Sequence, residues 1–171
     1  MKVEIYFDFL CEYCEMGHQQ WQELFPKFPQ IQPIWRPCEA HPLELEPYYG
    51  RHSHFAIEGL FFIQENRGEL SNYVNQIFSA VWEKGENIED IGLLSHYAES
   101  CGVDKTEFQT ALKLGKYRKK RQQANLYAWQ QLHLQAVPSY FSENGICLRS
   151  PLGVGISKKQ LDEFFEKICL K

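Results

Sequence analysis

Two cysteines three positions apart, Cys11 and Cys14, are the residues of this sequence best suited to carry out chemistry. Alternating apolar residues up to Phe7 predict a β-strand, and apolar residues at helical spacing after Cys14 predict a helix that ends near Pro26. Thiol-disulfide exchange needs one thiolate that attacks and a second thiol that resolves the mixed disulfide. At a helix start, backbone amides and the helix dipole favour ionisation of the first cysteine. The spacing therefore predicts Cys11 as the nucleophile and Cys14 as the resolving thiol.

The neighbours of the two cysteines are expected to modulate their reactivity. The pair between them is Glu12-Tyr13, and the carboxylate of Glu12 should disfavour a thiolate at Cys11. We therefore expect a weaker oxidant than a site with a basic or uncharged pair. His18 lies one helical turn beyond Cys14 and could also tune the site, although a surface or capping role is the simpler interpretation.

A zinc site is the main alternative use of these cysteines. Cys38 and His41 form a C-x-x-H pair that could supply two further ligands. Structural zinc pairs usually lie on turns, however, and not between a strand and a long helix, so we expect no metal. The remaining cysteines are interpreted as small buried side chains, and their spacing does not reveal whether they form disulfides: Cys38, Cys101, Cys147 and Cys169.

The predicted elements around the cysteines follow the order of a thioredoxin-like fold. A short strand is predicted near residues 31–36, and its prolines confine it to a sheet edge. Towards the C-terminus, Asn144-Gly145 predicts a hairpin, and Ser157 with Gln160 forms a capping box for a final helix. Strand, helix, strand, hairpin and helix indicate an α/β protein with a mixed central sheet flanked by helices.

A long helical segment interrupts this order. After a linker at residues 42–50, apolar residues recur at helical spacing, and the last predicted helix covers residues 122–134. The basic run at residues 116–121 is interpreted as a solvated helix face. The predicted organisation is a thioredoxin-like domain at residues 1–50 and 136–171 with a large all-helical insertion at residues 51–135.

The composition excludes some classes of partner. The formal net charge of −4 argues against a nucleic-acid partner. No apolar run approaches the roughly twenty residues of a membrane span, so no membrane partner is expected. Glu4 and Asp8 interrupt the N-terminal segment, which therefore does not fit a secretory signal, and a cytoplasmic location is expected.

The segment from Tyr6 to Cys14, followed by Gly17, resembles the opening of the DsbA family of thioredoxin-fold proteins, in its FrnE-like branch. This branch is similar in turn to 2-hydroxychromene-2-carboxylate isomerases and kappa-class glutathione transferases. Residues 81–88 and 102–104 resemble the helical insertion of the branch, and residues 136–141 resemble its loop with a cis-proline. The resemblance extends over nearly the whole chain.

The resemblance implies roles for residues that are unremarkable alone. It implies that Pro138 is cis and faces the sulfur of Cys11, while the backbone of Val137 pairs with a bound substrate. Asp8 matches an aspartate that is usual in the branch. Glu12 replaces the usual proline, so the redox poise of the family does not transfer to this chain.

Three functions remain in competition. The leading prediction is a DsbA-like thiol-disulfide oxidoreductase without a bound cofactor, whose partners are protein or small-molecule thiols and disulfides. The second is a glutathione-dependent isomerase or transferase, for which glutathione is the co-substrate. In those relatives serine stands where Cys11 does, so the presence of both Cys11 and Cys14 favours dithiol chemistry. The third is a thioredoxin-like module that binds a partner without catalysis.

Overall fold

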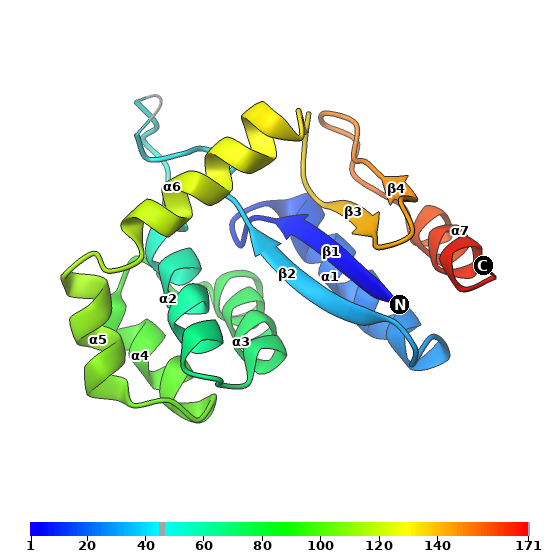
Figure 1. The fold of residues 1–171 in the computed structure, drawn as a ribbon. Coiled ribbons are helices and arrows are strands. Elements are labelled where there is room, and N and C mark those ends of the chain that lie inside the picture. Colours follow the sequence, from blue (N-terminus) through cyan, green and yellow to red (C-terminus); the bar gives the residue numbers. More distant parts are fainter. Residues whose placement is uncertain (45–46, 171) are drawn as a thin grey trace. The chain divides into compact units, whose positions relative to one another are not determined.

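The computed structural model describes residues 1–44 and 47–170 of the chain. The chain divides into two compact units. The first unit contains Met1–Ala40 and Tyr127–Lys171, and the second contains His41–Leu126. Both units are seen in Figure 1, where the first carries the strands and the second the helices α2 to α6.

The first unit is built on a four-stranded mixed sheet. Its strands are β1 (Lys2–Phe7), β2 (Gln32–Pro37), β3 (Ser139–Ser142) and β4 (Cys147–Leu148), in the order β2-β1-β3-β4. β1 pairs in parallel with β2 and antiparallel with β3, and β3 pairs antiparallel with β4. The prolines of β2 lie in an edge strand, as predicted, because they cannot donate to a ladder on both sides. Gly145 adopts a φ of +83° in the predicted hairpin turn.

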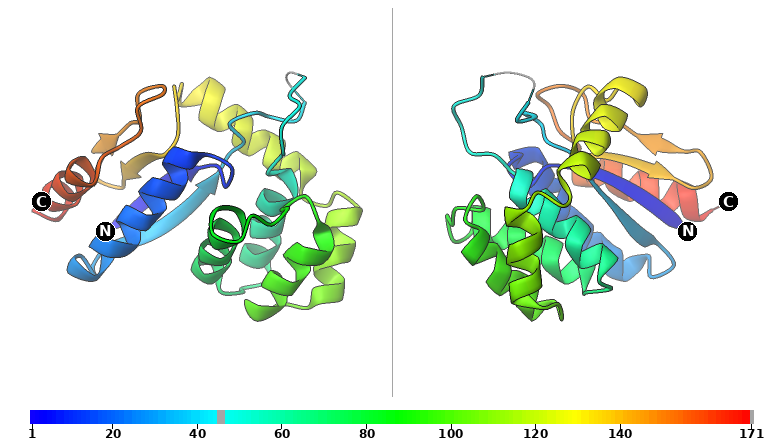
Figure 2. Two further views of the ribbon diagram at one scale, coloured as in Figure 1. Left: turned by 180° about the vertical axis from the view of Figure 1, so that it is seen from behind. Right: turned by 60° about the vertical axis from the view of Figure 1, so that its left-hand side comes forward.

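Two helices of this unit, α1 (Glu12–Leu24) and α7 (Lys158–Cys169), lie on one face of the sheet (Figure 2). Trp21 of α1 stacks on Tyr140 of β3 with ring centroids 6.3 Å apart, and meets Phe165 of α7 edge-on at 4.9 Å. These buried aromatic rings form the centre of the core. The predicted capping box of Ser157 and Gln160 starts α7.

The second unit is helical throughout its regular structure. Its helices are α2 (His54–Glu65), α3 (Leu70–Trp82), α4 (Ile91–Ser100), α5 (Lys105–Lys113) and α6 (Arg118–Leu126). Gly59 of α2 allows close packing, because a Cβ there would lie 2.4 Å from the hydroxyl of Tyr73 and 2.7 Å from the ring of Phe108. The linker predicted at residues 42–50 has no helix or strand where it is described, and residues 45 and 46 lie outside the described residues.

The helix predicted at residues 122–134 is wrong in both of its bounds. α6 begins at Arg118 and ends at Leu126, and a π-helical turn, Tyr127–Gln131, follows it. The wider turn is visible in the backbone, because the amide of Leu132 donates to the carbonyl of Tyr127, five residues earlier. The indole of Trp129 in this turn donates to the backbone carbonyl of Glu39 at 2.8 Å, which anchors the turn.

The basic run at residues 116–121, most of which lies in α6, is not a uniformly solvated face. Arg121 is 1% exposed. Its guanidinium pairs with the buried carboxylate of Glu58 at 3.0 Å and with Glu44 at 2.6 Å. The prediction missed this because the two carboxylates lie far from Arg121 in sequence, and a charge is buried only where such partners compensate its desolvation.

Among the described residues, no helix is long and apolar enough to cross a membrane.

The cysteines outside the C-x-x-C motif have unequal surroundings. Cys38 and Cys101 are buried, as predicted. Cys147 is exposed and Cys169 is half-buried, so the prediction of core positions was wrong for these two. Cys147 lies on β4, the edge strand of the sheet, and Cys169 is the last residue of α7.

Candidate active site

Cys11 lies at the junction of β1 and α1. It is the N-cap residue of α1, with extended backbone angles (φ −89°, ψ 120°), and its carbonyl accepts hydrogen bonds from the amides of Cys14 and Glu15 at 3.0 Å. The side chain of Cys11 is half-buried, and that of Cys14, one turn further, is buried. The fold therefore presents one sulfur to solvent and keeps the other inside.

The surroundings shift the pKa values of the two thiols in opposite directions. A hydrogen bond from the Cys14 thiol lowers the pKa of Cys11, with further help from the backbone amides of Cys14 and Tyr13. Burial raises the pKa of Cys14 well above its ordinary value, and the neighbouring Cys11 raises it further. Cys11 is therefore the sulfur suited to ionise and attack, while Cys14 stays protonated and donates to it.

Asp8 braces the loop that leads to Cys11. Its carboxylate is 3% exposed and accepts hydrogen bonds from the amide of Leu10 at 3.0 Å and from the amide of Ala40 at 2.7 Å. The backbone amide of Asp8 lies 3.5 Å from the sulfur of Cys14, to which it donates. The Asp8 carboxylate thus joins the end of β1 to the segment after β2 and lies close beneath both thiols.

The carboxylate that opposes the Cys11 thiolate belongs to Asp8, whereas the sequence indicated Glu12. The charge of Asp8 raises the pKa of both Cys11 and Cys14. Glu12 is exposed at the first turn of α1, where water surrounds its carboxylate and weakens its effect on the sulfur. The adjacency of Glu12 in sequence was therefore a poor guide to the electrostatics of this site.

The loop at Val137 and Pro138 lies against Cys11. The Val137–Pro138 peptide bond is cis. The carbonyl of Val137 is 3.6 Å from the sulfur of Cys11 and accepts its hydrogen bond when the thiol is protonated. Gly17 allows this approach, because a Cβ there would lie 3.0 Å from the ring of Pro138 and 2.8 Å from the hydroxyl of Tyr140.

Tyr13 connects α1 to a loop that the sequence did not single out. Its hydroxyl donates to the carbonyl of Gly153 at 2.9 Å. Its ring lies over Gly155, where a Cβ would come within 2.6 Å of the Tyr13 ring. Both glycines have positive φ angles, +72° and +73°. The Gly-x-Gly spacing is the sequence signal that could have marked this loop.

His18 is not a surface residue. Its side chain is 8% exposed, its ring meets Trp35 of β2 edge-on at 5.9 Å, and its Nε2 lies 3.2 Å from the side-chain nitrogen of Gln22. The expected surface or capping role was wrong, because position 18 falls on the face of α1 that packs on the sheet. His18 thus contributes to the packing of the helix that carries the cysteines.

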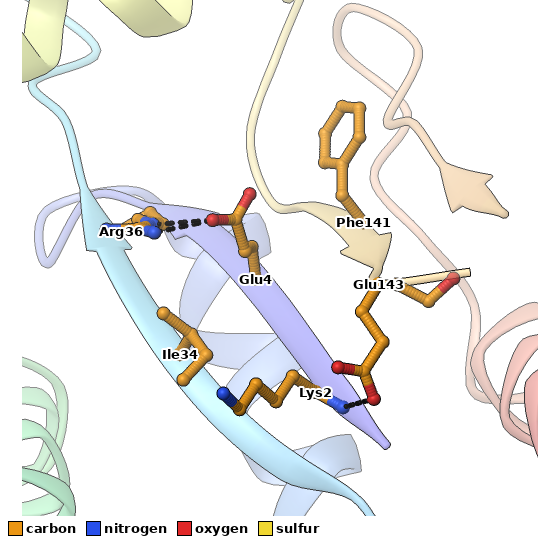
Figure 3. A pocket seen from close by; sticks show the side chains of 7 residues that line it. Lys2, Glu4, Ile34, Arg36, Phe141 and Glu143 are labelled. Carbon is orange, nitrogen blue, oxygen red and sulfur yellow. Dashed lines mark hydrogen bonds and ion pairs between the residues drawn. The ribbon is translucent and has the colours of Figure 1, made fainter. Parts of the chain in front are cut away.

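A hollow of about 290 Å³ lies on the opposite face of the sheet (Figure 3). Tyr140 of β3 packs on Trp21 of α1, so its neighbour Phe141 points to the other face, into this hollow. The Arg36 side chain bonds there to Glu4 across β1 and β2, with Nε 2.9 Å from the carboxylate. The cysteines of the motif do not line the hollow, so it is not the site of the thiol chemistry.

A structural zinc site needs several ligands close together. Among residues 1–44 and 47–170, no three histidine, cysteine, aspartate or glutamate side chains are placed to hold one metal ion.

Known proteins resemble this chain in sequence and in fold. Residues 2–156 match the family described as DSBA-like thioredoxin domain. The uncharacterized protein YwbO from Bacillus subtilis is 24% identical, over 81% of this chain and 84% of that protein.

Solved structures agree on the fold. A probable DsbA oxidoreductase from Streptomyces coelicolor has a TM-score of 0.77 at 15% identity, over 100% of this chain and 91% of that one. A 2-hydroxychromene-2-carboxylate isomerase has a TM-score of 0.75 at 16% identity, over 99% of this chain and 95% of that one. Since the family match covers most of its length, this chain belongs to the DsbA-like thioredoxin-domain family.

Proposed function

We propose that this protein is a thiol-disulfide oxidoreductase that works through a Cys11–Cys14 dithiol/disulfide pair. One observation carries the proposal. Cys11 is half-buried at the N-cap of α1 and Cys14 is buried one turn further, and their pKa values are shifted apart, downward for Cys11 and upward for Cys14. A solvent-facing thiolate backed by a buried thiol is the arrangement that a two-step exchange requires.

The reaction begins on the sulfur of Cys11. In the reducing direction, the Cys11 thiolate attacks one sulfur of a substrate disulfide, and the other substrate sulfur leaves as a thiolate that takes up a proton. Cys14 then loses its proton and attacks the sulfur of Cys11, which breaks the mixed disulfide and releases the second substrate thiol. The protein dithiol has lost two electrons and two protons, and the substrate disulfide has gained them. The oxidising direction is the reverse of these steps.

Val137 and Pro138 form the wall beside the reacting sulfur. The Val137 carbonyl is 3.6 Å from the sulfur of Cys11, so a substrate joined to this sulfur lies next to the Val137 backbone. That backbone can pair with an extended protein or small-molecule substrate without selecting its side chains. Protein and small-molecule disulfides are therefore the partners that we propose, and glutathione is to be tested among them.

The test is turnover of a protein disulfide, such as those of insulin, by the reduced protein with a thiol reductant. We expect turnover that is lost in Cys11→Ser. In Cys14→Ser, the mixed disulfide between substrate and Cys11 should accumulate and be visible by mass spectrometry. Turnover that survives Cys11→Ser would overturn the proposal, as would a Cys14→Ser variant that conjugates or isomerises a substrate with glutathione at the wild-type rate.

A further inference from the structure

In the first unit, the segments that hydrogen-bond to the stretch around Cys11 carry several acidic groups. Residues 8–18 include Cys11 itself, and hydrogen bonds connect them to the segments at residues 38–40, 134–140 and 150–157. These four segments contain four carboxylates and neither lysine nor arginine: Asp8, Glu12, Glu15 and Glu39. The side chains of these four segments therefore contribute negative charge, and the basic residues next to them in sequence, Arg149 and Lys158, lie just outside.

Only some of these carboxylates can act on a substrate. Asp8 and Glu39 are buried, at 3% and 1% exposure, and the oxygens of Asp8 already accept backbone amides. Glu12 is exposed and has no hydrogen-bond or ion-pair partner among the described residues. It follows Cys11 directly in the chain and is exposed, so an incoming disulfide meets its negative charge, although the carboxylate that shifts the pKa of Cys11 is that of Asp8.

Apolar side chains are exposed next to the part of α1 that carries Tyr13 and Met16. We call this apolar surface the ledge, and it consists of Leu152, Val154 and Met16, which are 77%, 67% and 38% exposed. Leu152 and Val154 belong to the loop of Gly153 and Gly155, and a Cβ at Gly155 would lie 3.4 Å from the Met16 side chain. The ledge therefore lies on the side of α1 that carries Tyr13 and Met16, which are two and five residues after Cys11.

Tyr13 holds the ledge in this place. Its hydroxyl bonds to Gly153, and its ring rests on Gly155, in the space that the missing side chain leaves. Because Leu152 and Val154 flank these two glycines, the tyrosine determines where their side chains are presented. Tyr13 is thus a positioning residue, whose effect on a substrate passes through the ledge.

We propose that Glu12 and the ledge held by Tyr13 make this site select disulfides whose cysteines are flanked by cationic and apolar side chains, and discriminate against glutathione disulfide. This inference rests on the proposed oxidoreductase function. Glutathione disulfide has a net negative charge and no large apolar side chain, so Glu12 repels it and the ledge gives it no contact. In a peptide with a basic residue and a leucine near its cysteine, the basic residue is attracted to Glu12 and the leucine is buried against the ledge.

The test uses single turnovers of the fully reduced protein, so that no regenerating reductant is needed. Each turnover converts one protein dithiol and one substrate disulfide into one protein disulfide and two substrate thiols. The substrates are glutathione disulfide and two disulfide-linked peptide dimers of equal length. The peptides have a leucine beside the cysteine and differ only in arginine or glutamate on its other side. Each rate constant is divided by that of dithiothreitol with the same substrate, which removes differences in intrinsic reactivity.

For charge, we expect the normalised rate to be highest for the arginine peptide and lowest for glutathione disulfide. Glu12→Gln should reduce the preference for the arginine over the glutamate peptide about threefold, because it removes both the attraction to arginine and the repulsion of glutamate, two solvent-screened charge interactions. Added salt should reduce the same preference in the wild type but not in Glu12→Gln. The control is Glu163→Gln, an exposed carboxylate on α7. A change in the intrinsic reactivity of Cys11 cancels in the ratio of the two peptides.

For the ledge, the double variant Leu152→Ser and Val154→Ser should slow the arginine peptide about fivefold and leave glutathione disulfide unchanged. Tyr13→Phe should shift the preference in the same direction, because the ring stays but the bond to Gly153 is lost. The controls are Leu114→Ser and Tyr49→Phe, at residues that are 79% and 99% exposed in the second unit.

Failure of this inference differs from failure of the proposed function. If the three substrates react at equal normalised rates, or if Glu12→Gln and the ledge variant leave the ratios unchanged, the selectivity is overturned while the exchange chemistry stands. If the reduced wild-type protein reacts with none of the disulfides, or if Cys11→Ser reacts as the wild type does, the oxidoreductase function itself is contradicted.

Discussion

The carboxylate of Asp8 accepts a hydrogen bond of 2.7 Å from the backbone amide of Ala40, 32 residues further along the chain. This bond joins the loop that precedes Cys11 to the segment after β2, and it places a buried negative charge beneath the two thiols. The same carboxylate therefore has two effects, one on the geometry of the loop and one on the ionisation of the cysteines.

The electrostatic effect can be isolated with Asp8→Asn. Asparagine keeps one oxygen to accept an amide but removes the charge that raises the pKa of Cys11, so we expect this pKa to fall further. Glu12→Gln should lower it less, since Glu12 is exposed. The pKa is obtained from the pH dependence of Cys11 alkylation, followed by mass spectrometry. A larger shift in Glu12→Gln than in Asp8→Asn would show that the effect was assigned to the wrong carboxylate.

The hydrogen bond from Cys14 should be the main cause of the lowered pKa of Cys11. Cys14→Ala removes the donor, and we expect the pKa of Cys11 to rise. Cys14→Ser retains a hydroxyl donor and should raise it less. The direction follows from the thiolate being the acceptor, so that losing a donor destabilises the charged form. In Cys14→Ala, alkylation of Cys11 should therefore begin at a higher pH. An unchanged pH profile of alkylation would mean that the backbone amides at the start of α1 are sufficient to lower the pKa of Cys11.

Gly17→Ala tests the contact between α1 and the proline loop. A methyl group there would lie 2.8 Å from the Tyr140 hydroxyl and 3.0 Å from the Pro138 ring. We expect a loss of about 1–3 kcal/mol in the free energy of unfolding, typical of overpacking, even though alanine favours a helix. Disulfide exchange should slow as Pro138 is displaced. Denaturant unfolding measures the first effect, with the exposed Gln19→Ala as control, and equal stability of the two variants would refute the close contact.

The buried ion pair of the second unit should dominate its stability. Arg121→Met removes the guanidinium that forms an ion pair with the carboxylate of Glu58, which is itself only 2% exposed. We expect a loss of about 3–5 kcal/mol in the free energy of unfolding. Adding Glu58→Leu to Arg121→Met should recover much of this loss, because the uncompensated charge is then removed. Lys119→Ala, at an exposed position of the same helix, is the control, and a loss as small as in this control would contradict the assignment.

The contact of Arg121 with Glu44 adds a pH dependence. The Arg121 hydrogen bond lowers the pKa of Glu44 below its ordinary value. The stability that it contributes is therefore present above the unfolded-state pKa of the carboxyl and is lost as the pH falls through the lowered folded-state value. Between neutral and acidic pH, the free energy of unfolding should fall less in Glu44→Gln than in the wild type. Parallel curves would indicate that Glu44 contributes nothing. The effect should be modest because Glu44 is partly exposed.

The sequence was informative where structure depends on neighbouring residues. The turn at Asn144-Gly145, the capping box at Ser157 and the helix start at Cys11 each follow from a few adjacent side chains, and each lies where it was expected. The position of β2 at the sheet edge follows from its two prolines. Such features need no knowledge of the rest of the chain.

The predictions failed where the partners come from far along the chain. The carboxylate that opposes ionisation of Cys11 was predicted to be that of the adjacent Glu12, but in the structure it is that of Asp8. The backbone amide of Ala40 donates to Asp8 and helps to hold its carboxylate in place. Arg121 was predicted to be exposed to solvent, but it is buried and forms an ion pair with Glu58, 63 residues away. The hydrogen bond from the Tyr13 hydroxyl to the Gly153 carbonyl joins residues that are 140 positions apart. A local pattern cannot show which side chains the fold brings together.

The central claim is that Cys11 and Cys14 form a working redox pair, and it is tested most directly by equilibrating the protein with graded glutathione buffers. The state of each cysteine is read by thiol trapping and mass spectrometry. We predict a reversible two-electron transition confined to Cys11 and Cys14, whose midpoint shows whether the protein donates or accepts disulfides. If no disulfide forms between them at any ratio, and glutathione remains attached to Cys11 instead, the dithiol mechanism is contradicted.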